Sequence, residues 1–237
     1  MRRQRVPDLL RPAIWIFRIR CRNDRESQMK DAAPTVFIVG RDRTLLAGLR
    51  RLLTALHLPV EIYATAQKFK EAHDPHRPGC LILDVPTPET IGMSLFRRLR
   101  REGSSIPVIF LTRRADVLTA VRAMREGVFD FLVKPVEEQY LAVQVQQAIA
   151  LDLRNRRQAV ENKSLAARFA GLSAREQEVL AQIVAGKSNK ATGVRLGIAT
   201  RTVGFHRANI MRKVGAKTVV ELVSLLLRSG WKTPMTD

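Results

Sequence analysis

Three polar side chains follow short apolar runs in the first two thirds of the chain. They are Asp84, Thr112 and Lys134. Short apolar runs that alternate with amphipathic segments are typical of parallel sheets. Parallel strands of one sheet end at the same edge, which is where open α/β folds bind their ligands. We therefore expect a carboxylate, a hydroxyl and an ammonium group to share one site.

The elements that position these groups are predicted between Thr35 and about Leu153. Strands are expected at 36–39, 60–63, 80–83, 108–111 and 131–133, and helices near 43–56, 66–72, 90–101, 116–126 and 137–153. Five strands and five helices in about 120 residues indicate an α/β flavodoxin-like domain.

The three strand ends resemble the receiver domain of two-component response regulators. In that family the residue at Asp84 accepts a phosphoryl group, and Pro88 and Gly92 follow it at the usual distance. The resemblance implies that Thr112 senses the phosphoryl group and that Lys134, which precedes Pro135, pairs with phosphate.

The acid pair that holds Mg²⁺ in the family is missing. Its two places are Gly40 and Arg41, and Asp42 stands one residue late. Thr87-Pro88-Glu89 also replaces the usual Met-Pro-Asp. Mg²⁺ is normally held by one or two carboxylates and waters in octahedral geometry, so we predict a degenerate receiver without a cofactor. The alternative is weak Mg²⁺ binding by Asp42 and Asp84. Arg41 either points to solvent or forks onto Asp84, replacing the metal.

The segment from Leu172 to Gly230 predicts four short helices. A capping box at Ser173 and Glu176 begins the first helix, and Gly186 ends it. The second runs from Ser188 to Gly197, the third from about Thr200 to Val214, and the fourth from a second capping box at Thr218–Glu221 to Gly230. Side chains expected to face the core are Val179, Leu180, Ile183, Val184, Val194 and Leu196.

Charge in this module indicates a nucleic-acid partner. From Arg168 to Gly230 there are 11 Lys and Arg residues against 3 acids, a balance of +8. Phosphate contacts by such a module supply much of its affinity for DNA. Several of the cations fall on the third helix, namely Arg201, Arg207, Arg212 and Lys213.

The module resembles the LuxR-type helix-turn-helix of bacterial response regulators. The matching residues are Leu172-Ser173-x-Arg175-Glu176-x-Glu178-Val179-Leu180, Gly186-x-Ser188-Asn189-Lys190 and Thr202-Val203-x-x-His206-Arg207-x-Asn209-Ile210-Met211-x-Lys213. The resemblance implies that the third helix enters the major groove and that Asn189 and Lys190 touch the DNA backbone. With the receiver-like domain, it is similar to regulators of the FixJ/NarL type. The resulting DNA-binding candidates are Asn189, Lys190, Arg201, Thr202, Phe205, His206, Arg207, Asn209 and Lys213.

The module departs from the family pattern on the third helix. Ala199 replaces a Ser cap, and Gly204, Phe205 and Ala208 occupy positions that face bases. Direct readout is expected from Arg201, Thr202 and Arg207, with Phe205 against a thymine methyl group. In the second helix, Thr192 and Gly193 replace an Ile-Ala pair, which predicts a less stable module.

The last helix is apolar on almost every side, from Val219 to Leu227. This excess of apolar surface predicts a homodimer, with two reading helices on half-sites one turn apart. We expect Leu226 to lie in the interface.

Composition and domain order complete the expectations. The domains are a basic extension at 1–33, the receiver-like domain at 34–153, a linker at 154–168, the DNA-binding domain at 169–231 and a tail at 232–237. The extension is expected to be disordered, or to precede a translation start at Met29. The linker is expected to extend the fifth helix and then to become a short tether. Such a tether permits a closed form, in which the receiver covers the reading helix, or an open dimer, and the sequence does not choose between them. The sequence contains no run of 18 or more apolar residues, so no segment is expected to span a membrane. Two cysteines, Cys21 and Cys80, fit a reducing cytoplasm.

These features predict a transcriptional regulator of promoter DNA, not an enzyme, with a receiver that works without phosphorylation. Two alternatives stay open. One is a conventional regulator in which a histidine kinase phosphorylates Asp84. The other is a modulator that forms heterodimers with related regulators.

Overall fold

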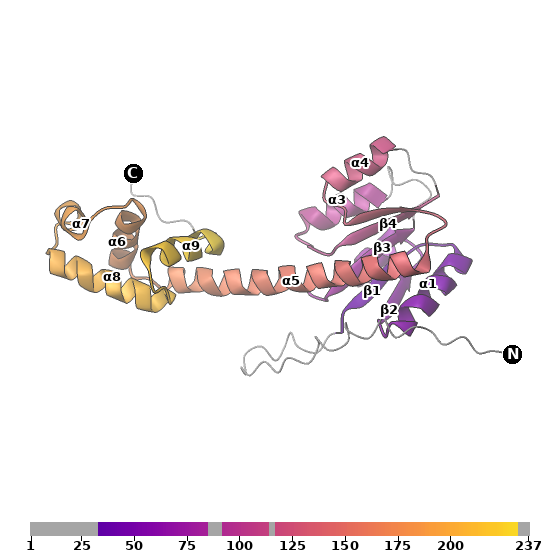
Figure 1. Cartoon of the computed structure of the whole chain (residues 1–237), viewed down its shortest axis with the longest axis horizontal. Helices are drawn as coiled ribbons and strands as arrows, with labels where there is room; N and C mark the ends of the chain where they lie inside the picture. Colours follow the sequence, from indigo (N-terminus) through magenta and orange to yellow (C-terminus); the bar gives the residue numbers. More distant parts are fainter. Residues whose placement is uncertain (1–32, 85–91, 114–116, 232–237) are drawn as a thin grey trace, which may run out of the picture.

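The computed structural model describes residues 33–84, 92–113 and 117–231 (Figure 1). The predictions for Thr87, Pro88 and Glu89, for the tail and for almost all of the amino-terminal extension lie outside the described residues. The described chain forms an α/β domain and a helical domain at opposite ends of one long helix (Figure 1). No helix in the described ranges is long and apolar enough to cross a membrane.

The α/β domain has a parallel sheet in the order β2-β1-β3-β4-β5. Its strands are β1 Thr35–Val39, β2 Val60–Tyr63, β3 Gly79–Asp84, β4 Val108–Thr112 and β5 Asp130–Val133. The helices between them are α1 Arg43–Ala55, α2 Ala66–Ala72, α3 Met93–Arg101 and α4 Val117–Arg125, and α5 Glu138–Ala170 follows β5. The predicted flavodoxin-like fold is confirmed.

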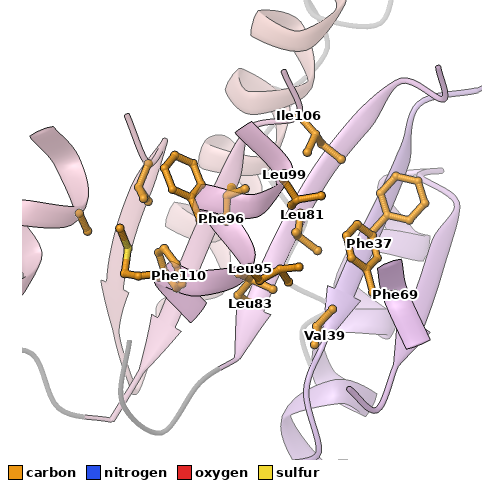
Figure 2. Packing of buried hydrophobic residues seen from close by; sticks show 14 residues of the cluster. Phe37, Val39, Phe69, Leu81, Leu83, Leu95, Phe96, Leu99, Ile106 and Phe110 are labelled. Atoms are coloured by element: carbon orange, nitrogen blue, oxygen red, sulfur yellow. The ribbon is translucent and has the colours of Figure 1, made fainter. Parts of the chain in front are cut away.

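Both faces of the sheet are buried, which explains why its strands are apolar without alternation. One face packs on α2, α3 and α4 through a cluster that includes Phe37, Phe69, Phe96 and Phe110 (Figure 2). The other face packs on α1 and α5 through a second cluster that includes Leu53 and Val145. This double burial fixes where each strand ends and therefore where its terminal polar side chain lies.

The predicted tether is absent, because α5 continues as one helix to Ala170. Its first half packs in the α/β core, whereas Phe169 near its end belongs to the core of the helical domain. The predicted linker contains Arg156, whose guanidinium donates to Asp152 at 2.7 Å and to three backbone carbonyls of residues 75–77. Asp152, which is fully buried, also accepts from the amide of Gly79 at 2.9 Å. This part of the linker is therefore anchored to the α/β domain.

The helical domain consists of α6 Ala174–Val184, α7 Asn189–Leu196, α8 Thr200–Val214 and α9 Val219–Ser229, in addition to the end of α5. The capping box of Ser173 and Glu176 is confirmed, and Gly186 follows α6 with a φ of 70°. At the start of α9 only half of the predicted box forms. The Thr218 hydroxyl accepts from the amide of Glu221, but the Glu221 carboxylate accepts from the amide of Lys217.

Three apolar side chains of this domain face differently from the sequence prediction. Val184 and Val194 were expected inside but are exposed, and Val194 is 80% exposed. Leu226 was expected at an interface but is buried in the core, at 7% exposure. The helices are short and rich in apolar residues, so that their sequences do not fix which apolar side chain turns inward.

Candidate carboxylate site and nucleic-acid interface

The structure brings together the three polar side chains predicted to meet. Asp84, Thr112 and Lys134 lie at or just after the carboxyl ends of β3, β4 and β5, which are neighbours in the sheet. The Lys134 ammonium donates to the Asp84 carboxylate at 2.5 Å, and both side chains are largely buried. Thr112 is fully buried, and the peptide bond between Lys134 and Pro135 is cis. The carboxylate is therefore held by a fixed cation.

Gly40, at the end of β1, lies directly beside this carboxylate. A Cβ atom added at Gly40 would stand 2.9 Å from the Asp84 Cβ and 3.3 Å from its Oδ2. Carbon atoms do not approach this closely without a shift, so Asp84 fills the space that a side chain at position 40 needs. The Asp84 side chain thus occupies the space that an acidic side chain at position 40 would need.

The Arg41 side chain does not replace a metal ion at Asp84. Its Nε donates to the carbonyl of Ala64 at 3.2 Å, and the residue is exposed. Of the two roles considered for Arg41, the structure therefore agrees with the solvent-exposed one and not with the fork onto Asp84. The loop after β2 supplies a backbone acceptor close to Arg41, which a reading of sequence spacing does not reveal.

Asp42 has two partners that compete with a metal ion. Its Oδ1 accepts from the Leu45 amide at 3.2 Å, which caps α1, and its Oδ2 accepts from Arg113 at 3.1 Å. The Leu45 amide and the Arg113 guanidinium lower the pKa of Asp42 below its ordinary value. Sequence analysis missed Arg113, whose only signal was a cation placed directly after Thr112 at a strand end.

These residues do not fit a divalent cation. Mg²⁺ needs free carboxylate oxygens that can share an octahedron with water, but Asp84 is paired with Lys134 and Asp42 with Arg113. Among the described residues there is no group of three His, Cys, Asp or Glu side chains that could hold a metal ion. The cations that contact these two carboxylates are Lys134 at Asp84 and Arg113 at Asp42.

The second candidate site is the solvent-facing side of α8. Val203, Ile210 and Val214 bury the inner side of α8 in the core of the domain. The opposite side exposes five residues, which are Arg201, Thr202, Phe205, Ala208 and Arg212. Arg212 donates to Asn209 at 2.9 Å, so Asn209 lies beside this row. The row is three turns long, and a helix of this kind can enter the major groove of DNA.

His206 and Arg207 lie on the flanks of α8 and not in the exposed row. Both are partly buried, and a helix of 3.6 residues per turn turns Arg207 toward the side that carries Val203. This placement does not favour the predicted base contact by Arg207. Guanidinium and imidazole groups at the flanks of a reading helix are better placed for the phosphates that border a groove.

Lys213 has a structural partner. Its ammonium donates to the buried carboxylate of Glu176 at 2.6 Å, which joins the last turn of α8 to the first turn of α6. Burial raises the pKa of Glu176, but Lys213 and the Ser173 amide outweigh burial and leave that pKa below its ordinary value. This structural role does not favour the predicted contact of Lys213 with DNA.

The amino-terminal end of α7 lies close to the middle of α8. The Asn189 Nδ2 is 3.9 Å from the point that a Cβ at Gly204 would occupy, and Lys190 is exposed. Gly193 lets the two helices meet, since a Cβ there would stand 2.7 Å from the carbonyl of Ile198. Asn189 thus lies beside α8, and the implied contacts of Asn189 and Lys190 with the DNA backbone stay a prediction.

Helix α9 exposes three apolar side chains, of which Val220 and Leu227 lie opposite the core residues Leu222 and Leu226 and Val219 lies in the first turn. The exposed residues are Val219, Val220 and Leu227, of which Leu227 is 78% exposed. Arg228 on α9 pairs with Glu161 on α5 at 3.1 Å, which ties the two helices together beside this surface. We use the name α9 face for these three exposed residues.

Comparisons with known proteins agree with this geometry. Residues 36–146 match the response regulator receiver domain, and residues 170–226 match the LuxR family of bacterial regulatory proteins. The response regulator protein TodT of Pseudomonas putida is 36% identical over 200 residues, which are 84% of this chain and 88% of that protein. The transcriptional regulatory protein FixJ of Bradyrhizobium diazoefficiens is 33% identical over 195 residues, covering 82% of this chain and 95% of FixJ. The solved structure of the response regulator StyR is 38% identical and superposes with a TM-score of 0.69, covering 83% of this chain and all of StyR.

Proposed function

Because the chain belongs to the response regulators that join a receiver domain to a LuxR-type DNA-binding domain, we propose that it controls promoters as a homodimer whose receiver does not need phosphorylation. Its function as a DNA-binding transcriptional regulator, not an enzyme, follows from the family. The dimer, the DNA contacts and the mode of control are proposals. We also propose that it works in the cytoplasm of a bacterium, where bacterial promoters lie.

The proposed DNA interface consists of the exposed row on α8 and the start of α7. Arg201 and Arg212 place cations at the two ends of the row, and Lys190 adds a third from α7. The proposed dimer contact is the α9 face, because the described part of the domain leaves its apolar side chains exposed. A two-fold axis through α9 would present two reading helices to the two half-sites of a promoter.

The proposal on the receiver rests on one observation, the pairing of Asp84 with Lys134 beside a glycine at position 40. Transfer of a phosphoryl group requires a cation that neutralises the negative charge of the phosphoryl oxygens, and Mg²⁺ normally supplies it. Here Asp42 is engaged by Arg113 and has no neighbouring carboxylate at Gly40 or Arg41. The concentration of the protein, or binding of a protein partner, then sets its regulatory activity, and a histidine kinase is not required.

The test is phosphorylation by a small-molecule donor such as acetyl phosphate, with and without Mg²⁺, measured by intact mass. We expect no gain of a phosphoryl group on the full-length protein and no Mg²⁺-dependent change in its melting temperature. The matched control is Asp84→Asn, which should bind selected promoter DNA as tightly as the unchanged protein. A phosphoryl group that is gained only when Asp84 is present, and that changes DNA affinity, would restore the conventional kinase-driven switch.

The heterodimer alternative has its own test. A regulator that works alone should enrich a specific duplex from a randomised library and should sediment as a dimer on it. A protein that enriches no sequence alone, but does so when mixed with a related regulator, acts as a modulator.

A further inference from the structure

The centre of the exposed row on α8 carries a feature that phosphate binding does not explain. Phe205 is 65% exposed, and its ring meets only the edge of the neighbouring His206 in the described ring contacts, at 6.1 Å between centroids. Exposure of an aromatic ring to water is unfavourable, and covering the ring on binding lowers the free energy in proportion to the area covered. A binding partner should therefore cover this ring.

Two positions next to Phe205, Gly204 and Ala208, have no hydrogen-bonding side chain. Gly204 precedes it, and Ala208 lies one turn later on the same side. The atom nearest to a Cβ at Gly204 would be the Asn189 Nδ2 at 3.9 Å, so the surface at Gly204 is open. Arg201 lies one turn before Phe205 and Arg212 two turns after it. The row is therefore basic at its ends and apolar at its centre.

We propose that Phe205 determines sequence specificity by packing on the C5 methyl group of a pyrimidine in the major groove. This inference rests on the proposed binding of promoter DNA. Thymine presents such a methyl group on its major-groove edge, and 5-methylcytosine carries the same group at the same ring position. A methyl group next to an open phenyl ring supplies the apolar partner that the centre of the row lacks.

The chemistry of the other bases argues against them at this position. Guanine, adenine and cytosine present polar groups to the major groove. A phenyl ring placed on these groups would remove them from water without returning a hydrogen bond, which is costly. Arg201 and Thr202, at the start of the row, keep the capacity to donate hydrogen bonds to neighbouring bases or phosphates. Phe205 thus selects for a methyl group and also selects against the remaining base edges.

The experiment begins with the full-length protein, which selects a duplex from a randomised library. Each thymine of the selected half-site is then replaced in turn by deoxyuridine, which lacks only the methyl group. We expect one thymine in each half-site whose replacement weakens binding about fourfold, the change that corresponds to one buried methyl group. Phe205→Ala should bind both duplexes more weakly and should no longer distinguish them.

Two variants serve as controls. Phe205→Leu keeps an apolar side chain and should retain part of the discrimination between thymine and deoxyuridine. Val194→Ala removes an exposed apolar side chain from α7 and should leave the discrimination unchanged. Because Phe205 and Val194 are both exposed, all three variants should unfold at the temperature of the unchanged protein.

A further pair of duplexes distinguishes the two sources of the methyl group. The sensitive thymine is replaced by cytosine or by 5-methylcytosine, with guanine opposite. Recovery of affinity with 5-methylcytosine shows that the methyl group is read on either base, and no recovery assigns the contact to thymine.

Two results would overturn the inference while leaving promoter binding intact. One is equal affinity for thymine and deoxyuridine at every position of a selected half-site, and the other is a deoxyuridine penalty that persists in Phe205→Ala. A failure to enrich any sequence would overturn promoter binding itself, and this inference with it.

Discussion

Replacing Leu227 by Glu tests whether the α9 face pairs two copies of the DNA-binding domain. Leu227 and Val220 are 78% and 81% exposed and lie seven residues apart, so they share one side of α9. The preceding residue, Leu226, is buried in the core of the domain. Two adjacent leucines therefore separate an effect on the interface from an effect on folding.

The expected magnitudes follow from burial. Covering one exposed Leu side chain is worth about 1.5–3 kcal/mol, and a two-fold axis counts each side chain twice. Leu227→Glu should therefore cost roughly 3–6 kcal/mol of dimer stability, which weakens the dimer by about 10²- to 10⁴-fold. Its effect on the free energy of unfolding should stay within about 0.5 kcal/mol, as for other surface substitutions. Leu226→Ala should instead lower the free energy of unfolding by about 2–5 kcal/mol, because it leaves a cavity.

Sedimentation of the full-length variants gives the dimer dissociation constant, and thermal unfolding gives the stability. Binding to a duplex with two half-sites and to one with a single half-site measures the contribution of pairing to affinity. The reasoning fails if Leu227→Glu retains the dimer constant and the two-site affinity of the unchanged protein.

Three further predictions concern single side chains. Thr192 is buried on α7, and its hydroxyl has no hydrogen-bond partner among the described residues. Thr192→Val should therefore raise the free energy of unfolding of the DNA-binding domain by about 1–3 kcal/mol. Calorimetry that shows a loss of stability would contradict this. Burial and the charge of Arg156 lower the pKa of His73 from its ordinary 6.5, so the folded state favours the uncharged ring. The free energy of unfolding should therefore fall as the pH drops below about 6.5. His73→Phe should remove this part of the pH dependence in denaturant titrations between pH 7 and pH 5. Arg201→Ala should weaken specific DNA binding by about 1–3 kcal/mol if Arg201 reads a base, and should lower the salt dependence if it contacts a phosphate; a salt-independent affinity of the unchanged protein would refute the phosphate-contact model.

The sheet and the meeting of Asp84 with Lys134 could be predicted because each depends on local patterns. Continuous apolar runs mark strands that are buried on both faces, and the direction of parallel strands places their ends together. The capping box at Ser173 was equally readable, since both of its hydrogen bonds join residues three positions apart. Such features require no knowledge of how distant segments pack.

The partners of long side chains could not be predicted in the same way. Asp42 and Arg113 are 71 residues apart, and Arg41 reaches the carbonyl of Ala64 across a loop. Each contact depends on the relative position of two loops at the edge of the sheet, which sequence spacing does not encode. The same limit explains Glu221, because a shift of one residue in the cap decides whether its carboxylate accepts from Lys217 or from Thr218.

The continuity of α5 was misjudged because its middle is polar. Arg154–Ser164 offers few apolar side chains to either core, but it also lacks Pro and Gly, which are the residues that end helices. A helix of 33 residues is about 50 Å long, so the receiver and the DNA-binding domain stand apart along it (Figure 1). At its far end Arg168 donates to the carbonyl of Val214 at 3.0 Å, in the last turn of α8. The orientation of α8 is therefore set by α5 and its own domain, and its exposed row faces solvent without any cover from the receiver in the described structure. DNA binding in this arrangement requires no release of α8 from the receiver, which is what a regulator without a phosphorylation switch needs.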